Sequence, residues 1–329
     1  MKKFRWGIIG AGRIAATFAE CVAGLADAEV AAIASRSTPD PESLTSTMHA
    51  RKFYRTYEEL AEDAEIDAIY IATPHRYHYE NAMLCLEHGK PLLVEKAFTV
   101  NAFEAEAVIK TARAKNLFVM EAMWTRFHPV FRQARKWMDE GRIGEVNLVT
   151  SVLGFYAKRD LKDRLLNPDL AGGTLLDLGC YTLGVSQFVF PEKPKEIKAQ
   201  GFIGESGVDE AVSVSMNYGA GRLSQFVTTF ISQPHLQVTI CGEKGRIIIH
   251  PKFYTSSKVS LWQGEKETVV ELPFRINGFE YEIEEAQRCM HKGLIESPLM
   301  THQNTIDTMQ NLDEIRRQIG MDYKFETRP

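Results

Sequence analysis

A glycine-rich segment near the start of the chain has the residue types that bind phosphate groups. The letters GAGRIA at Gly10–Ala15 follow an apolar run and open an amphipathic stretch, which is the G-x-G-x-x-A arrangement of dinucleotide-binding turns. Gly10 permits the tight turn, Gly12 lets the backbone approach a pyrophosphate, and Ala15 lets a helix pack closely on a strand. The helix N-terminus then offers N–H donors and partial positive charge to the phosphates. The expected cofactor contacts in this segment are Gly10, Gly12, Arg13 and Ile14.

The end of the second apolar run bears on which dinucleotide is bound. NAD enzymes usually place Asp or Glu there to hydrogen-bond the adenosine ribose, whereas this chain has Ser35-Arg36-Ser37. An arginine flanked by two hydroxyls suits a 2′-phosphate through charge-assisted, bidentate contacts. The other interpretation of Arg36 is a solvated side chain in a turn. Because the acid is absent and the cation is present, the segment favours NADP over NAD, with Ser35, Arg36 and Ser37 as contacts.

Polar side chains also follow the later apolar runs of the first half. In an open α/β sheet, ligands bind at the carboxyl ends of the strands. The cofactor contacts expected there are Thr73, Pro74, His75, His78, Glu95 and Lys96. His75 and His78 also have the spacing of a metal-binding pair, but no carboxylate or third ligand is suitably spaced, so we expect no metal.

Three residues have side chains suited to proton transfer. Lys96 comes just past the apolar residues Leu92–Val94, so its ammonium is expected to point toward the ligand, although a lysine at a strand end is more commonly a snorkelling side chain. Asp177 and Tyr181 follow a double glycine and are four residues apart, hence on one helix face. A core tyrosine with a bonded hydroxyl is the alternative for Tyr181. We predict that Lys96, Asp177 and Tyr181 are catalytic.

The chemistry that suits these groups is the oxidation of a secondary alcohol, which requires removal of the hydroxyl proton. A free tyrosine has a pKa near ~10 and is a poor base at neutral pH. An ammonium about 4 Å away, at an effective dielectric of ~20, contributes ~4 kcal/mol, or ~3 pKa units. Lys96 beside Tyr181 would lower the phenol pKa to ~7 at the lowest, since desolvation opposes this shift. A carboxylate close to the phenol would raise its pKa, so Asp177 is assigned a positioning role.

The pattern of apolar runs predicts two kinds of sheet. Strands are expected at Phe4–Gly10, Glu29–Ser35, Ala68–Thr73, Pro91–Glu95 and Leu117–Ala122. Helices are expected between them, one with Ile14, Phe18, Val22 and Leu25 on a single face and others at Tyr79–His88 and Ala102–Lys115. This alternation predicts a parallel sheet covered on both faces. The first domain is therefore assigned to residues 1–123, as an NAD(P)-binding Rossmann domain.

From about Val146 the connections between β-rich runs become too short for crossover helices, which predicts a mostly antiparallel open sheet. The expected strands are Val146–Tyr156, Glu196–Ile203, Glu210–Asn217, Arg222–Ile231, Gln237–Ile249 and Lys258–Trp262. Helices at Thr174–Phe190, Glu280–His291 and Gln303–Ile319 would cover one face. Residues 124–329 are thus an α+β domain, and the chain as a whole belongs to the α/β class.

Composition excludes several classes of protein. The 329 residues include 39 Lys and Arg against 43 Asp and Glu, and a net charge of −4 argues against nucleic-acid binding. Five scattered cysteines without a C-x-x-C pair fit a reducing cytoplasm. Apolar runs fall short of the roughly 18 residues of a membrane span, and the run from Trp6 to Ala11 is too short for a signal peptide. We expect a soluble, cytoplasmic protein.

The motifs together make the whole chain resemble the glucose–fructose oxidoreductase, inositol dehydrogenase and MocA family. The resemblance is carried by GAGRIA at Gly10–Ala15, EKAF at Glu95–Phe98 and GGTLLDLGCY at Gly172–Tyr181. The segments MEAMWTRFHP at Met120–Pro129 and GVDEAVSV at Gly207–Val214 further resemble the branch of dimeric dihydrodiol dehydrogenases and NADP-dependent D-xylose dehydrogenases.

The resemblance implies a role for several residues. Lys96 matches the catalytic lysine of the family's E-K-P motif, and Asp177 with Tyr181 matches its D-x-G-x-[HY] pair, whose last member transfers the proton. Arg36 matches an arginine used for NADP in related enzymes. The chain departs from the motif at Ala97, where the family usually has proline. The resemblance also implies a homodimer formed sheet to sheet through the second domain, where Phe226 and Phe230 alternate with polar or smaller residues.

These observations favour an NADP-dependent dehydrogenase that acts on a sugar or vicinal diol. Aromatic residues near the carboxyl ends of the strands could form a wall for such a substrate. The expected substrate contacts are Trp124, Arg126 and Phe279. A place in the hydrophobic core is equally expected for these three residues. Two other functions stay open: a glycosidase-type enzyme with an internal NAD redox cycle, and a nucleotide-sensing regulator without catalysis. The presence of Lys96, Asp177 and Tyr181 together counts against the regulator.

Overall fold

The computed structural model describes residues 3–38 and 40–326, which divide into two compact units. The first unit comprises the residues up to Trp124 together with Arg275–Ile306, and the second comprises Thr125–Phe274 together with the residues from Asp307 onward. The segment 275–306, which the sequence assigned to the second domain, belongs to the first unit. It does so because helix α8 (Glu280–His291) packs against α1 (Arg13–Gly24).

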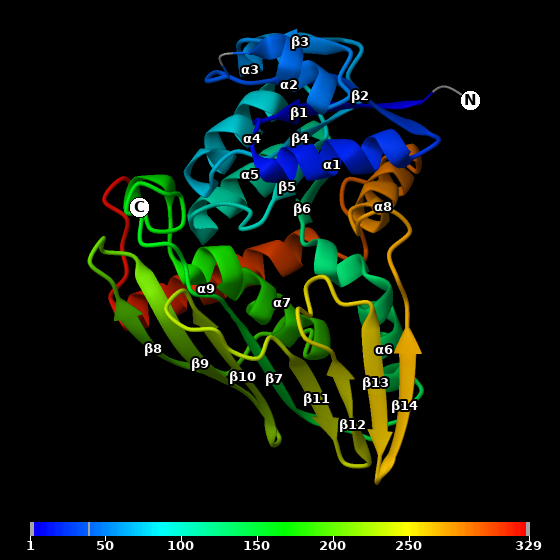
Figure 1. Cartoon of the computed structure of the whole chain (residues 1–329), viewed down its shortest axis with the longest axis vertical. Coiled ribbons are helices and arrows are strands. Elements are labelled where there is room, and N and C mark those ends of the chain that lie inside the picture. Colours follow the sequence, from blue (N-terminus) through cyan, green and yellow to red (C-terminus); the bar gives the residue numbers. More distant parts are fainter. Residues whose placement is uncertain (1–2, 39, 327–329) are drawn as a thin grey trace. The chain divides into compact units, whose positions relative to one another are not determined.

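Among its described residues, the first unit contains a parallel sheet with the strand order β3-β2-β1-β4-β5-β6 (Figure 1). The strands are β1 (Phe4–Ile9), β2 (Ala28–Ala34), β3 (Lys52–Tyr54), β4 (Ala68–Ile71), β5 (Leu92–Glu95) and β6 (Val119–Ala122). Right-handed crossovers place α1 and α2 (Pro41–Thr47) on one face of the sheet. The same rule places α3 (Tyr57–Glu62), α4 (His78–Glu87) and α5 (Ala102–Lys115) on the other. The predicted parallel sheet with two covered faces is therefore confirmed.

Helices α2 and α3 and strand β3 were not expected from the sequence. Helix α2 buries none of its residues, and all three residues of β3 are only half-buried, so neither leaves an apolar pattern that could be detected. Helix α2 begins instead at an Asp40 cap, whose side chain accepts a hydrogen bond from the backbone of Ser43.

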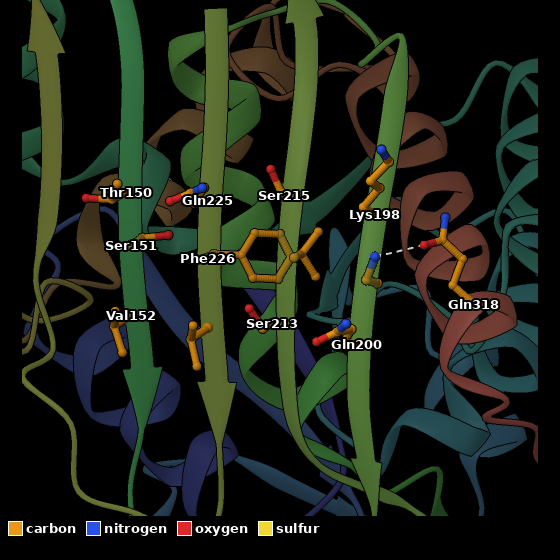
Figure 2. A pocket seen from close by; sticks show the side chains of 13 residues that line it. Thr150, Ser151, Val152, Lys198, Gln200, Ser213, Ser215, Gln225, Phe226 and Gln318 are labelled. Carbon is orange, nitrogen blue, oxygen red and sulfur yellow. Dashed lines mark hydrogen bonds between the residues drawn. The ribbon is translucent and has the colours of Figure 1, made fainter.

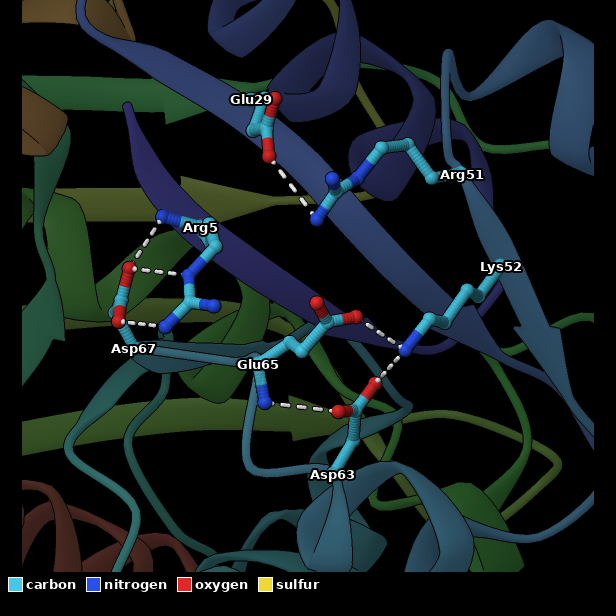
Figure 3. Close-up of polar contacts among 7 residues, drawn as sticks. All are labelled: Arg5, Glu29, Arg51, Lys52, Asp63, Glu65 and Asp67. Atoms are coloured by element: carbon cyan, nitrogen blue, oxygen red, sulfur yellow. Dashed lines mark hydrogen bonds and ion pairs between the residues drawn. The ribbon is translucent and has the colours of Figure 1, made fainter. Parts of the chain in front are cut away.

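Ion pairs fasten the strands of the first unit at their amino ends (Figure 3). Arg5, in β1, makes a bidentate ion pair with Asp67, which lies just before β4: Nη2 donates to Oδ1 at 2.7 Å and Nε donates to Oδ2 at 3.1 Å. Lys52, at the start of β3, lies 3.0 Å from Asp63 and 2.6 Å from Glu65. Figure 3 shows these pairs with the neighbouring pair of Arg51 and Glu29. This charge cluster is at the opposite end of the strands from the carboxyl edge, where the sequence predicts the ligand.

Among its described residues, the second unit contains a sheet with the strand order β14-β13-β12-β11-β7-β10-β9-β8 (Figure 1). The strands are β7 (Val146–Gly154), β8 (Glu196–Ile203), β9 (Asp209–Gly219), β10 (Arg222–Thr229), β11 (Val238–Gly242), β12 (Gly245–Ile249), β13 (Lys258–Gln263) and β14 (Lys266–Glu271). Neighbouring strands are antiparallel except for β7 and β10, which are parallel. The expected mostly antiparallel sheet is thus confirmed.

Two details of the second sheet differ from expectation. The run Gln237–Ile249 is a hairpin of two strands, β11 and β12, rather than one strand. Strand β12 begins at Gly245, where a Cβ would lie 2.1 Å from the carbonyl oxygen of Trp262. Strand β14 was not expected, because it is an edge strand with mostly exposed residues.

Helices α6 (Pro129–Asp139) and α7 (Cys180–Val189) pack on one face of this sheet. Helix α9 (His302–Ile319) reaches the edge strand β8, where the side-chain amide of Gln318 accepts from the backbone of Ala199 and donates to the carbonyl of Ile197, each at 2.8 Å. Gln318 thereby satisfies backbone groups that an edge strand would otherwise expose. Among the described residues, no helix combines the length and apolar character needed to cross a membrane.

Candidate functional site

The glycine turn between β1 and α1 has the backbone geometry that the motif demands. Gly10 has φ +109°, and a Cβ there would lie 2.6 Å from the carbonyl oxygen of Ala72, so only glycine fits. Gly12 forms the N-cap of α1 with φ −79°, and a Cβ built on it meets nothing within 4 Å. Ala15 is fully buried. The turn is therefore closed against the sheet at Gly10 and open at Gly12.

The first turn of α1 carries no acidic side chain that would oppose an anion at its N-terminus. Ile14 differs from expectation, because it is 39% exposed whereas Phe18 and Val22, expected on the same face, are fully buried. An open backbone and an exposed apolar side chain fit a dinucleotide with its pyrophosphate at this helix end.

The cation at the end of β2 is held on an aromatic ring. The guanidinium carbon of Arg36 lies 4.4 Å from the centre of the Tyr57 ring, and its Nη2 lies 3.6 Å from Oε1 of Glu80. The Arg36 side chain is still 54% exposed. Ser35 is buried and Ser37 is exposed. The arrangement leaves a cation accessible where the sequence predicts a 2′-phosphate.

His78 connects two loops at the carboxyl edge of the sheet. Its ring is fully buried, with Nε2 2.7 Å from the carbonyl oxygen of Thr73 and Nδ1 2.8 Å from that of Ala97. Burial lowers the pKa of His78, and a neutral ring donates to one of the two carbonyls. His78 was expected to contact the cofactor; its occupied nitrogens instead join the loops after β4 and β5. The neighbouring His75 is buried as well, with its ring 5.8 Å from that of His78.

Lys96 follows β5 directly, and hydrogen bonds fix the backbone at Lys96 and at the next residue, Ala97. The Lys96 N–H donates to the buried Glu95 carboxylate at 3.2 Å, and the next carbonyl, that of Ala97, faces the His78 ring. The Lys96–Ala97 peptide is cis. The other Glu95 oxygen accepts a hydrogen bond from the hydroxyl of Tyr70. The Lys96 side chain is half-buried.

A second buried acid near Glu95 was not found from the sequence. Glu282, in α8, is fully buried, and neither of its carboxyl oxygens has a hydrogen-bond partner among the described residues. Burial and the nearby Glu95 charge raise the pKa of Glu282 well above its ordinary value. A glutamate on an amphipathic helix usually faces solvent, so the sequence contains no signal for this position.

In the second unit, the double glycine leads into a π-helical turn, Leu175–Gly179, and then into α7. Such turns occur frequently at functional sites. This turn contains the buried Asp177, whose Oδ1 accepts from Nη1 of Arg164 at 3.1 Å. Tyr181 lies in the first turn of α7 and is half-buried, with its ring 6.4 Å from that of Tyr254. Arg164 was missed because no motif marks its loop.

The three expected substrate contacts have different surroundings. Phe279 is only 2% exposed and packs against Trp124, with ring centres 4.8 Å apart, and against Phe18. It is therefore a core residue of the first unit rather than part of an open wall. Trp124 is half-buried in the same unit. In the second unit, Arg126 is half-buried and donates to Oε1 of Gln187 at 2.9 Å.

Two family models match the chain. Residues 4–123 match the model described as "Oxidoreductase family, NAD-binding Rossmann fold", and residues 131–248 match the "GFO/IDH/MocA C-terminal domain". Among curated relatives, the trans-1,2-dihydrobenzene-1,2-diol dehydrogenase of Xenopus tropicalis is 34% identical over 330 residues, which cover 97% of this chain and 99% of that protein. The Mus musculus protein of that name is 33% identical over 339 residues, covering 98% and 99%.

Solved structures share the fold along nearly the whole chain. The aldose–aldose oxidoreductase of Caulobacter crescentus, complexed with glycerol, has a TM-score of 0.86 at 21% identity and covers 96% of this chain and 97% of its own. A 3-ketoreductase of Actinomadura kijaniata, in complex with NADP and TDP-benzene, has a TM-score of 0.85 at 23% identity, with 97% and 98% covered. At this identity the likeness concerns the fold alone.

Proposed function

The chain belongs to the GFO/IDH/MocA oxidoreductase family, as its motifs predict, and from this premise we propose that it is an NADP-dependent dehydrogenase acting on a secondary alcohol of a sugar or vicinal diol. The observation that carries the proposal is the open dinucleotide turn at Gly12 together with the accessible Arg36 cation at the end of the neighbouring strand. The names of the full-length relatives support a diol as the substrate.

The residues of the first unit fit a bound NADP. The N-cap Gly12 leaves room for the pyrophosphate, and Arg36 supplies a cation for the 2′-phosphate. Thr73, Pro74 and His75 remain proposed contacts, and His78 is proposed to act on the cofactor only through the backbone of Thr73 and Ala97. NAD is the alternative cofactor, because an exposed arginine does not exclude it.

When bound, the nicotinamide accepts or donates the hydride. We assign the accompanying proton transfer to Tyr181, whose phenolate would take the proton of the substrate hydroxyl in the oxidation and whose phenol would return a proton in the reduction. Lys96 is proposed to lower the pKa of that phenol, and its backbone is already held by Glu95 and by the carbonyl contact of His78. Asp177 is proposed to keep the substrate or Lys96 in place, with Arg164 compensating its charge.

The test is the initial rate of NADP⁺ reduction on a panel of aldoses and cyclic vicinal diols. Lys96→Met is measured in parallel with Lys110→Met, which removes an exposed lysine of α5 in the same unit. Turnover by the wild type that collapses only in Lys96→Met is the expected result. Binding of NADP without net reduction on any member contradicts the proposal, and it favours an internal redox cycle or a nucleotide sensor.

We also propose that the chain forms a cytoplasmic homodimer through the face of the second sheet opposite α6 and α7. Figure 2 shows the side chains that line a hollow on this face, which include Thr150, Lys198, Gln200, Ser213, Ser215 and Gln225. The hollow has a volume of about 550 Å³. Exposed apolar side chains on the same strands, such as Phe202 and Leu223, support a protein interface. Phe226 and Phe230, which the sequence pattern suggested for this interface, are buried. A monomer at micromolar concentration in light scattering would contradict this.

A further inference from the structure

A buried polar cluster holds the double-glycine turn of the second unit. Asp209, the first residue of β9, is fully buried, and its Oδ2 accepts from the backbone N–H of Leu175 at 2.6 Å. Leu175 is the first residue of the π-helical turn that contains Asp177. The other oxygen, Oδ1, packs so closely on Gly173 that a Cβ at that glycine would lie 2.3 Å from it. The carboxylate thus contacts the turn where a side chain cannot fit.

The same turn is held from a second direction by the segment after α9. The buried Tyr323 donates its hydroxyl hydrogen to the carbonyl oxygen of Gly172. Its ring packs on the guanidinium of Arg316, at 5.3 Å, and Arg316 is itself fully buried. Arg316 donates to Glu326 at 2.8 Å, which ties the residues beyond α9 into the cluster.

The cluster has polar atoms that nothing among the described residues satisfies. Oδ1 of Asp209 and Nε and Nη1 of Arg316 are buried without a hydrogen-bond partner. Burial raises the pKa of Asp209 to about 7, although the Arg316 charge and backbone donors oppose the shift. A buried carboxyl group with one oxygen left without a partner is costly, so its presence next to this turn calls for an explanation.

We propose that Asp209 and Tyr323 are positioning residues for the reaction, which hold the Gly172–Gly173 turn and thereby the segment that presents Asp177 and Tyr181. The inference rests on the proposed function, because it assigns the purpose of the cluster to proton transfer by Tyr181. A small displacement of a reacting group costs about 100-fold in rate, so two anchors on the turn are sufficient to control turnover without touching the substrate.

Tyr323→Phe tests the proposal, because it removes only the hydroxyl that bonds Gly172. The matched control is Tyr218→Phe, which removes a second buried hydroxyl from the same unit. Among the described residues, that hydroxyl donates only to the Met216 sulfur, at 3.9 Å. We expect kcat to fall by about 10- to 100-fold in Tyr323→Phe, with KM for NADP unchanged, and to stay within about two-fold of wild type in Tyr218→Phe.

Asp209→Asn and Asp209→Ala separate the acid group of Asp209 from the contacts that its side chain makes with the turn. Asparagine keeps an oxygen that accepts from the Leu175 N–H, whereas alanine does not, so we expect Asn to retain most of the kcat that Ala loses. Thermal unfolding establishes that each variant is folded. Folded Tyr323→Phe and Asp209→Ala proteins that both keep wild-type kcat would overturn the inference.

Amide hydrogen exchange over residues 172–181 distinguishes this inference from the proposed function. If the wild type turns over no member of the panel, the proposed function fails, but faster exchange of this segment in Tyr323→Phe than in Tyr218→Phe still supports the anchoring. Equal exchange in the two variants would overturn it, whatever the activity.

Discussion

Arg36 and Tyr57 form a stacked pair at the carboxyl edge of the first sheet, with the guanidinium carbon 4.4 Å from the ring centre. The ring comes from the first residue of α3, which a capping box fixes through Thr56 and Glu59. Such contacts contribute about 0.5 to 1 kcal/mol at exposed sites. Because the facing Glu80 pair is long and exposed, the ring is the stronger constraint on where the Arg36 cation lies.

This pair predicts how the cofactor preference changes on substitution. Arg36→Ser removes a charge-assisted contact worth about 1.5 to 3 kcal/mol, so kcat/KM for NADP is expected to fall by about 10- to 100-fold while that for NAD changes little. Tyr57→Leu keeps the Arg36 charge but removes the aromatic ring on which it packs, so kcat/KM is expected to fall by about 2- to 5-fold for NADP alone. Arg51→Ser removes a cation at the amino ends of the strands and serves as the control. Equal losses for both cofactors would contradict the assignment of Arg36.

The contact between Arg164 and Asp177 gives a second prediction. Arg164→Met leaves the buried carboxylate without this cation, so kcat/KM for the alcohol is expected to fall by about 10-fold or more, with Arg164→Lys intermediate because it keeps the charge but not the planar fork. Lys162→Met, at an exposed position of the same loop, is the control. An Arg164→Met enzyme as active as this control would mean that Asp177 does not depend on the ion pair.

How much of this site is visible in the sequence depends on how local each feature is. The Gly10 turn, the strand before it and the helix after it are encoded in adjacent residues, so their pattern predicts them. The long-range contacts leave no such pattern. Arg164 contacts Asp177, which follows it by 13 residues, and Asp209 contacts Leu175, which precedes it by 34 residues. Glu282 is on a helix whose charged residues look solvated, yet it is buried because α8 packs with α1.

The stability of the protein is expected to depend on pH through Asp209. Its folded pKa of about 7 lies above the value of about 3.9 in an unfolded chain, so between these values the folded protein holds a proton that the unfolded chain has released. The contribution of Asp209 to the free energy of unfolding is therefore full below pH 4 and is lost as the pH rises to 7.

Asp209→Asn does not titrate in this window, so it should gain stability relative to wild type as the pH rises from 4.5 to 8, by about 3 kcal/mol. Chemical denaturation at several pH values measures the difference. Glu265→Gln, in the exposed turn between β13 and β14, provides the control for removal of an acid. Parallel stability curves for wild type and Asp209→Asn would show that Asp209 titrates with its ordinary pKa.

The two glycines of the dinucleotide turn allow stability and cofactor binding to be separated. At Gly10, alanine brings a Cβ within 2.6 Å of the Ala72 carbonyl at a φ of +109°, so Gly10→Ala is expected to lower the free energy of unfolding by about 2 kcal/mol or more. At Gly12 the backbone is ordinary and the Cβ meets open space, so Gly12→Ala should change the free energy of unfolding by less than about 1 kcal/mol.

The methyl group added in Gly12→Ala would nevertheless occupy the space through which a pyrophosphate approaches the start of α1. Gly12→Ala is therefore expected to be folded and to bind NADPH at least about 10-fold more weakly, as read by titration of the fluorescence of the reduced nicotinamide. Unchanged affinity in a folded Gly12→Ala protein would place the pyrophosphate elsewhere, because a methyl group in its path must weaken binding.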